Sequence, residues 1–290
     1  MSTQITTAFV EQYGRNVSLL AQQMGSKLRG TVDVESITGK NAFFEQVGSV
    51  AAQKRLSRHS DTPQLDTPHD RRRVSLDDYE WADLIDDSDK VRMLIDPTSS
   101  YAKAAAAAMG RSIDDVIITA FNASASTGVA GGTSTALPST SKFATSNQSD
   151  GLTLTKLRTA KKFFDSNDVD PSIKRYIVTG ATQVSDLLGD STITSADYNT
   201  VRALVQGDID TFLGFKFVMC NRLSMDATNT DDRLCFAYTE DAVKLALGKD
   251  VTAKISERAD KSYSTQVYYC MSIGATRMEE TKVFQIPCNE

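Results

Sequence analysis

The sequence has few of the residues that build disulfide frameworks, metal centres or membrane spans. It contains four cysteines and two histidines in 290 residues, and no two cysteines form a CxxC pair. Because Cys220, Cys235, Cys270 and Cys288 are far apart, their spacing indicates neither a zinc site nor a disulfide scaffold, and we expect reduced, buried thiols. No apolar run approaches the roughly 18 residues of a membrane span, so no membrane association is expected.

An excess of positive charge is also missing. The formal net charge of −5 argues against a dedicated nucleic-acid binder, which is normally basic. With 40% hydrophobic residues, the chain can bury one large core or two modest ones. The N-terminus lacks a basic-then-apolar signal, and apolar residues at helical spacing from Phe9 to Met24 predict an amphipathic helix there. The composition therefore indicates a globular protein, and no cofactor is expected.

One unusually long helix is predicted from residue 96 to about residue 122. Asp96 is a favourable N-cap, and Pro97 suits the first helical position. From Tyr101 to Phe121, apolar residues recur at three- and four-residue spacing and form a narrow, alanine-rich stripe. Gly110 interrupts the helix at a cost of about 1 kcal/mol relative to alanine. At 1.5 Å per residue the helix is roughly 40 Å long, which is typical of a structural spine.

An extended, charge-segregated segment precedes this helix. Apolar and polar residues alternate at 32–35 and again at 73–77, which predicts the two half-exposed strands of a long arm. The stretch 53–70 is too polar to fold alone, and a lone hairpin is marginally stable, so the arm needs a partner surface. Its basic block (Lys54, Arg55, Arg58, Arg71, Arg72 and Arg73) is followed by an acidic block (Asp77, Asp78, Glu80, Asp83, Asp86, Asp87 and Asp89). We expect one copy's basic block to face another copy's acidic block.

The rest of the chain predicts a mixed helix and strand region that ends in strands. Residues 123–151 are rich in Ser, Thr, Gly and Ala without periodicity, which predicts a surface loop or flexible connection. Helices are then expected around 154–164, before 189, at 198–205 and at 241–247, and strands at 175–178, 215–218, 234–238, 266–273 and 282–286. The last two strands are expected to form a sheet that packs on the long helix.

Several strings and their order resemble the major capsid proteins of tailed bacteriophages, whose fold also occurs in herpesvirus capsids and encapsulin shells. The strings are DPTSSYAKA at the start of the long helix, RYIV at 175–178, GDIDTFLGFKFVMCNRL at 207–223 and FAYTEDAVKLALGKDVTAKISERADK at 236–261. The long helix also carries an R-x-x-D-D-x-x-I-x-A pattern at Arg111, Asp114, Asp115, Ile118 and Ala120. The resemblance covers nearly the whole chain.

The resemblance implies an α+β protein with the tailed-phage capsid fold. Its parts would be an N-terminal arm (1–31), an extended hairpin loop (32–94), a peripheral domain with the spine helix (95–150), an α/β axial domain (151–248) and returning peripheral strands (249–290). It further implies a structural protein, not an enzyme, that self-assembles into pentamers and hexamers. These would form the icosahedral head shell of the virion around a double-stranded DNA genome, after assembly in the host bacterial cytoplasm.

The resemblance also implies partners. They are other copies of the chain, a portal, a decoration protein, and packaged DNA held without specificity. A separate scaffolding protein is expected as well, because no long scaffolding segment precedes the arm.

The candidate residues for contacts between subunits lie in the two charge blocks: Arg71, Arg72, Arg73, Asp77, Asp78, Glu80, Trp81, Asp86 and Asp87. Trp81 is the single tryptophan, and it suits either an interface anchor or a local core. The arginines suit phosphate as well as a protein partner, and the acidic residues that follow them favour the protein.

A few residues have the chemistry of catalytic or metal sites. His69 and Asp70 beside Ser60 or Ser75 contain the residue types of a catalytic triad, but they lie in an arginine-rich loop without a nucleophile elbow, which favours solvated side chains. The acidic run 83–89 lacks the glycine and terminal glutamate of a calcium loop. The remaining alternatives are an encapsulin-like compartment shell and, more remotely, a metal-dependent enzyme that uses the aspartate clusters.

Overall fold

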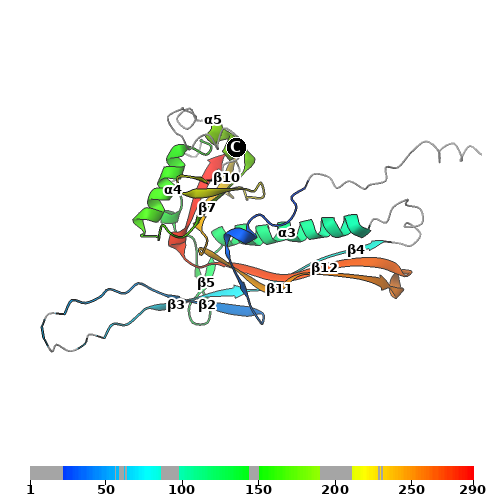
Figure 1. The fold of residues 1–290 in the computed structure, drawn as a ribbon, viewed down its shortest axis with the longest axis horizontal. Coiled ribbons are helices and arrows are strands. Elements are labelled where there is room, and N and C mark those ends of the chain that lie inside the picture. Colours follow the sequence, from blue (N-terminus) through cyan, green and yellow to red (C-terminus); the bar gives the residue numbers. More distant parts are fainter. Residues whose placement is uncertain are drawn as a thin grey trace, which may run out of the picture. The chain divides into compact units, whose positions relative to one another are not determined.

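The structure is a computed structural model that describes residues 22–55, 57–58, 62, 64–85, 98–143, 150–189, 211–227, 229 and 231–290 (Figure 1). The chain divides into two compact units. The first contains 1–26, 78–113 and 249–272, and the second contains 27–77, 114–248 and 273–290. Each unit therefore combines segments that are distant in the sequence. Among the described helices, none has the length and apolar character needed to cross a membrane.

The longest helix, α3 (Thr98–Asn122), confirms the expected spine (Figure 1). Its 25 residues give a length of roughly 37 Å. Most side chains predicted for the apolar stripe are buried, namely Ala105, Met109, Ile113, Ile117, Ala120 and Phe121, and Ala108 and Val116 are half-buried. Asp96 and Pro97, the expected start of the helix, lie outside the described residues.

In the first unit, the N-terminal segment crosses α3 at Gly110. A Cβ atom on Gly110 would lie 2.4 Å from the backbone carbon of Gly25, so only glycine permits this approach. The next residue, Arg111, donates hydrogen bonds to Gln22 Oε1 at 2.9 Å and to the Gln23 carbonyl at 3.3 Å. The glycine that interrupts the predicted helix thus provides a crossing point. Residues 22–24 are not helical, and the rest of the expected N-terminal helix lies outside the described residues.

In the second unit, the two aspartates of the R-x-x-D-D pattern hold other segments. Asp114 is fully buried and accepts backbone N–H groups from Lys27 at 3.1 Å and Leu28 at 3.0 Å. Asp115 accepts two hydrogen bonds from the guanidinium of Arg222. The two aspartates of the pattern therefore attach the segments around residues 27–28 and 222 to α3.

The hairpin arm is built from β2 (Asn41–Val47) and β3 (His69–Ser75), which pair antiparallel along their whole length. The predicted pairing of 32–35 with 73–77 is wrong. Residues 33–36 form β1 (Asp33–Ser36), which pairs in parallel with the start of β11 (Val243–Arg258). The alternating pattern identified the strands correctly, but it contains no information on which strand is the partner.

The connection after α3 is more ordered than predicted. β5 (Ala125–Thr127) and β6 (Thr133–Thr135) form a small hairpin, and β5 adds to β3, giving the sheet order β2-β3-β5-β6. The prediction of a loop or flexible connection is therefore wrong for these residues. The buried guanidinium of Arg277 explains the order, since it donates to the carbonyls of Phe121, Ala123 and Thr135 at 2.8 to 3.0 Å.

The α/β region is a five-stranded sheet in the order β13-β10-β7-β9-β8. Its strands are β7 (Arg175–Thr179), β8 (Thr211–Phe212), β9 (Phe215–Met219), β10 (Asp232–Thr239) and β13 (Val283–Asn289). The helices are α4 (Leu154–Ser166) and α5 (Ala181–Gly189). The predicted helices and strands from 154 to 238 are confirmed, except for the helix at 198–205, which lies outside the described residues.

Two features of the C-terminal third differ from the prediction. Residues 241–247 do not form a helix, since the chain turns at Ala242, whose N–H bonds the Thr239 carbonyl at 3.0 Å, and β11 begins at Val243. A short apolar run fits a buried strand as well as a helix, and here pairing with β1 and β12 (Ser264–Arg277) decides. The final strand β13 pairs with β10, not with β12, the other predicted terminal strand.

The four cysteines are all buried and free of disulfides, as predicted. Cys235 lies in the centre of the α/β sheet. A hydrogen bond with the Cys288 thiol and burial both raise the pKa of Cys235 well above its usual value. Cys220, Cys235 and Cys288 lie in the second unit, and Cys270 lies in the first.

Candidate intersubunit surface

The base of the hairpin arm has one buried face and one exposed face. Phe44 on β2 and Val74 on β3 turn inward and pack with Ala246 and Met278. Side chains alternate along a strand, so Phe43, the next residue on β2, turns outward and is 42% exposed. The outward face also carries Glu45 and Val47 on β2, opposite Arg71 and His69 on β3.

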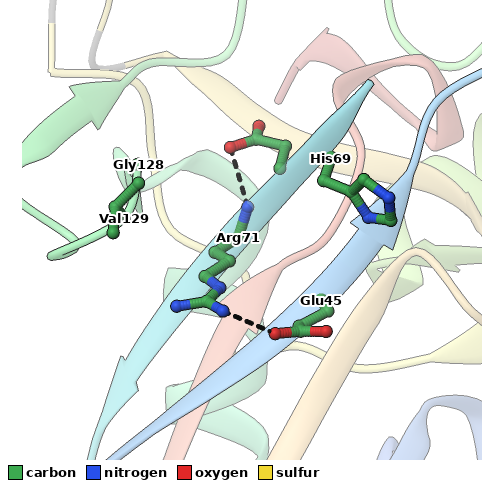
Figure 2. Close-up of a pocket in the computed structure, with 6 residues that line it drawn as sticks. Glu45, His69, Arg71, Gly128 and Val129 are labelled. Atoms are coloured by element: carbon green, nitrogen blue, oxygen red, sulfur yellow. Dashed lines mark hydrogen bonds and ion pairs between the residues drawn. The ribbon is translucent and has the colours of Figure 1, made fainter. Parts of the chain in front are cut away.

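The outward face contains a hollow of about 350 Å³ lined by Glu45, His69, Asp70, Arg71, Gly128 and Val129 (Figure 2). Arg71 Nη2 donates to Glu45 Oε1 at 2.8 Å, and the backbone N–H of Arg71 donates to Asp70 Oδ1 at 2.8 Å. The side chains of Arg71 and Glu45 are both exposed, so their ion pair contributes at most about 1 kcal/mol to stability. Val129, on the turn between β5 and β6, is 84% exposed. Charged and apolar groups therefore lie together on this exposed surface.

Arg72 differs from its neighbours because it points inward. It is buried, its Nη2 lies 2.9 Å from Glu280 Oε2, and its Nε donates to Gln46 Oε1 at 3.3 Å. Arg277, whose side chain is fully buried, lies 3.6 Å from the other oxygen of Glu280. Burial lowers the pKa of Arg277, and the Glu280 carboxylate opposes that shift. Arg72, Glu280 and Arg277 form what we call the arginine cluster, so the charge of Arg72 is paired within its own chain.

Arg73 is half-buried and crosses the turn between β5 and β6. A Cβ atom on Gly131 would lie 2.7 Å from Arg73 Cβ, and Gly131 has a φ of +67°, a conformation that favours glycine. Arg73 Nε is buried without a hydrogen-bond partner in the part of the chain that the structure describes. Of the three candidate arginines, Arg71 is the most accessible.

The acidic candidates lie on β4 (Asp77–Ile85), an edge strand beside β12. Asp77 and Asp78 are exposed. Glu80 accepts a hydrogen bond from Tyr268 Oη at 2.9 Å, and this carboxylate raises the pKa of Tyr268 to about 12. Trp81 is half-buried, with its ring 6.4 Å from that of Tyr269 in an edge-on arrangement. Asp86 and Asp87 lie outside the described residues.

Exposed apolar side chains on the arm are not among the candidate contacts predicted from the sequence, which are charged residues and Trp81. Val47 and Val50 are 65% and 55% exposed, and Leu65 is 45% exposed. The signal was present in the sequence, since Phe43 and Val47 are an even number of residues apart on a strand and share a face.

The enzymatic alternatives find no support in these positions. His69 and Ser75 occupy the two ends of β3, which at about 3.3 Å per residue places them roughly 20 Å apart, too far for a triad. His59 and Ser60 lie outside the described residues. Within the described ranges, no group of three or more His, Cys, Asp or Glu side chains is placed to hold a metal ion.

Comparisons with solved structures define the fold. The capsid structure of cyanophage P-SCSP1u is similar, with a TM-score of 0.76 and 17% identity, over 99% of this chain and 94% of that chain. A structure from Mycobacterium phage Che8 has a TM-score of 0.70 and 18% identity, over 96% of this chain and 97% of that chain. At these identities the likeness shows the fold alone, which is that of tailed-phage major capsid proteins.

The family is shown by sequence. Residues 5–290 match the model of the phage capsid protein family, and the chain belongs to this family. It is therefore a structural protein of a bacteriophage capsid shell. This agrees with the family resemblance described from the sequence. A search of curated proteins found no match.

Proposed function

We propose that this protein assembles into pentamers and hexamers that form an icosahedral head shell around a double-stranded DNA genome. The observation that carries the proposal is the family match over residues 5–290, on a chain whose fold is similar to that of tailed-phage major capsid proteins. A shell needs many interfaces, each weak enough to be corrected and together strong enough to last.

The exposed face of the arm supports self-association. Its apolar side chains, Phe43, Val47 and Val129, suit the core of an interface, and Arg71 suits its rim. The exposed carboxylates Asp77 and Asp78 on β4 provide the opposite charge. Exposed ion pairs contribute about 0–1 kcal/mol each, so they would set the register between copies more than the affinity. The arginine cluster makes Arg72 a support of the arm and not a contact.

The finer assignments are proposals of the same kind. We propose the expected division into arm, hairpin, peripheral and axial parts, with two changes. β13 is counted in the axial part because it pairs with β10, and β1 and β4 are counted with the sheet of β11 and β12. Assembly would take place in the host bacterial cytoplasm with a separate scaffolding protein and a portal, and a decoration protein would bind afterwards. Asp86 and Asp87 remain candidate contacts, as does Trp81, although its edge contact with Tyr269 equally fits a local core role.

The test is electron microscopy and sedimentation of the purified protein, co-expressed with the scaffolding protein from the same genome if particles do not form alone. Rings of five or six subunits, or closed shells, are expected. A monomer under every condition would overturn the proposal. Particles that enclose an enzyme and not DNA would favour the encapsulin-like alternative, which a neighbouring cargo gene in place of a portal gene would also indicate.

The charge match between copies is tested by substitution. Asp77→Lys with Asp78→Lys is expected to reduce the yield of particles, and adding Arg71→Glu is expected to restore part of it. The control, Asp231→Lys with Glu257→Lys, makes the same change in net charge at exposed positions outside the two blocks. Equal yields from all three variants would contradict the proposed pairing.

A further inference from the structure

The outward face of α4 carries a cluster of positive charge in a chain whose net charge is −5. Leu157, Ala160 and Phe164 are fully buried on the opposite face, and the Phe164 ring lies 5.9 Å from that of Phe215 on β9. This packing fixes the rotation of the helix. Arg158, Lys161 and Lys162, at three- and four-residue spacing, are therefore exposed together.

The positive charge of this face is not cancelled by the carboxylates of the described chain. Asp165, the one acidic residue on the face, is paired with Arg175 Nη1 at 2.7 Å. Arg158, Lys161 and Lys162 make no ion pair or hydrogen bond through their side chains within the described residues. Asp168 and Asp170 follow the end of the helix, and Asp170 accepts the backbone N–H of Ser172 at 2.8 Å. We call Arg158, Lys161 and Lys162 the α4 cations.

The surface beside these residues is hollowed. A depression of about 470 Å³ is lined by Arg158, Lys161, Lys162, Asp165, Ser166 and Leu213, the last from the turn between β8 and β9. The helix dipole does not explain this arrangement. It favours cations in the last turn of a helix, and the last turn of α4 contains no basic residue.

We propose that the α4 cations bind the phosphate backbone of duplex DNA without sequence preference. The inference rests on the proposed function, which supplies DNA as the partner enclosed by the shell. The choice between DNA and a second copy follows from composition. Protein interfaces are depleted in lysine and are anchored by aromatic or aliphatic groups. Among the described residues that line the hollow, two are lysines and the one apolar residue is the half-buried Leu213. Phosphates need only mobile cations within reach.

The three-arginine block is a poorer phosphate site. Arg72 is buried against Glu280, Arg71 bonds Glu45, and the Arg73 side chain packs across Gly131. The α4 cations have none of these commitments. In an otherwise acidic chain, they would determine which surface the DNA approaches.

The test is DNA binding by the unassembled protein. Fluorescence anisotropy with a labelled 30-base-pair duplex would be measured between 20 and 200 mM salt for the wild type and for Arg158→Gln/Lys161→Gln/Lys162→Gln. Glutamine has nearly the helix propensity of lysine and arginine, so α4 is expected to remain folded, which circular dichroism checks. Losing three phosphate contacts should lower the slope of log K against log salt by about 2–3 units, with an affinity loss of at least tenfold at low salt.

The matched control is Lys103→Gln/Lys254→Gln/Lys261→Gln, which removes the same charge from exposed positions away from α4. It is expected to retain most of the affinity. An equal loss in both variants would show that only net charge matters and would overturn the inference, as would a wild type that does not bind the duplex.

Assembly provides the readout that separates this inference from the proposed function. The triple α4 variant is expected to form particles as the wild type does in electron microscopy. If it fails to assemble but binds DNA normally, the face is a contact between copies and the inference is wrong, although the shell function stands. If the wild type never assembles, the shell function fails whatever the DNA result.

Discussion

Replacing Glu280 with glutamine tests the physical account of the arginine cluster. The carboxylate of Glu280 lies 2.9 Å from Arg72 and 3.6 Å from Arg277, with side-chain exposures of 19%, 6% and 0%. Glutamine preserves the shape but removes the only negative charge in the cluster. Two buried guanidinium groups are then left with neutral partners, and they repel each other.

The expected cost is set by partial burial. A pair of charges about 4 Å apart is worth roughly 4 kcal/mol at an effective dielectric constant of 20, and breaking a buried pair typically costs about 3–5 kcal/mol. Arg277 keeps its bonds to backbone carbonyls, and Glu280 is partly solvated, so we expect about 3 kcal/mol. For domains of 150–250 residues, about 2–4 °C are lost per kcal/mol, which gives a fall in Tm of roughly 6–12 °C.

Circular dichroism during thermal unfolding measures this change. The control is Glu279→Gln, because Glu279 pairs with Lys282 at 3.1 Å but is 46% exposed, and its loss should cost less than about 1 kcal/mol. Adding Arg72→Met to Glu280→Gln should recover part of the lost stability, since one unpaired buried cation is removed. Equal, small shifts for Glu280→Gln and Glu279→Gln would refute the reasoning.

Three further predictions concern the spine and the C-terminal residue. Gly110→Ala should destabilise the chain, despite the roughly 1 kcal/mol gain in helix propensity, because its Cβ would lie 2.4 Å from the backbone of Gly25; a raised Tm would contradict this. Asp114→Asn should cost about 2–3 kcal/mol by weakening charge-assisted bonds to two backbone N–H groups, with faster proteolysis near residue 27; unchanged digestion would exclude the fastening role. The Arg233 guanidinium lowers the pKa of Glu290 from 4.5 to about 2, so this pair should stabilise the fold above pH 4.5 and lose its contribution as the pH falls towards 2. Because Glu290 is exposed, solvent screening limits that contribution to at most about 1 kcal/mol, and Arg233→Gln should remove this part of the acid sensitivity in denaturant titrations.

Elements set by neighbouring residues were predictable from the sequence, and contacts between residues distant in the sequence were not. The spine was predictable because its apolar period is local. The partner of β1 was not, since 33–36 and 244–247 meet only in three dimensions, and local alternation is the same for any partner. Residues 241–247 illustrate a second limit, because AVKLAL satisfies helix propensity while pairing with β1 and β12 makes it a strand.

The candidate surface was predictable in composition but not in detail. Charge segregation identified the basic and acidic blocks, yet it treated Arg71, Arg72 and Arg73 as equivalent. Alternation along β3 would have separated them, since Arg72 and the apolar Val74 have the same parity and turn inward. Arg72 and its partner Glu280 are 208 positions apart in the sequence, so no local pattern could have predicted their ion pair. The α4 cations could have been found from the sequence, because they alternate with Leu157, Ala160 and Phe164 at helical spacing.

The parallel pairing of β1 with β11 has a consequence for the order of events during synthesis. Glu35 and Lys244, which join the two strands, are 209 residues apart. At about 5–20 residues per second, the ribosome needs roughly 10–40 s after making Glu35 before Lys244 exists. The strand that leads into the arm therefore has no partner until most of the chain has been translated. We therefore expect that a subunit which associates through its arm, as proposed, does so only once its chain is nearly complete.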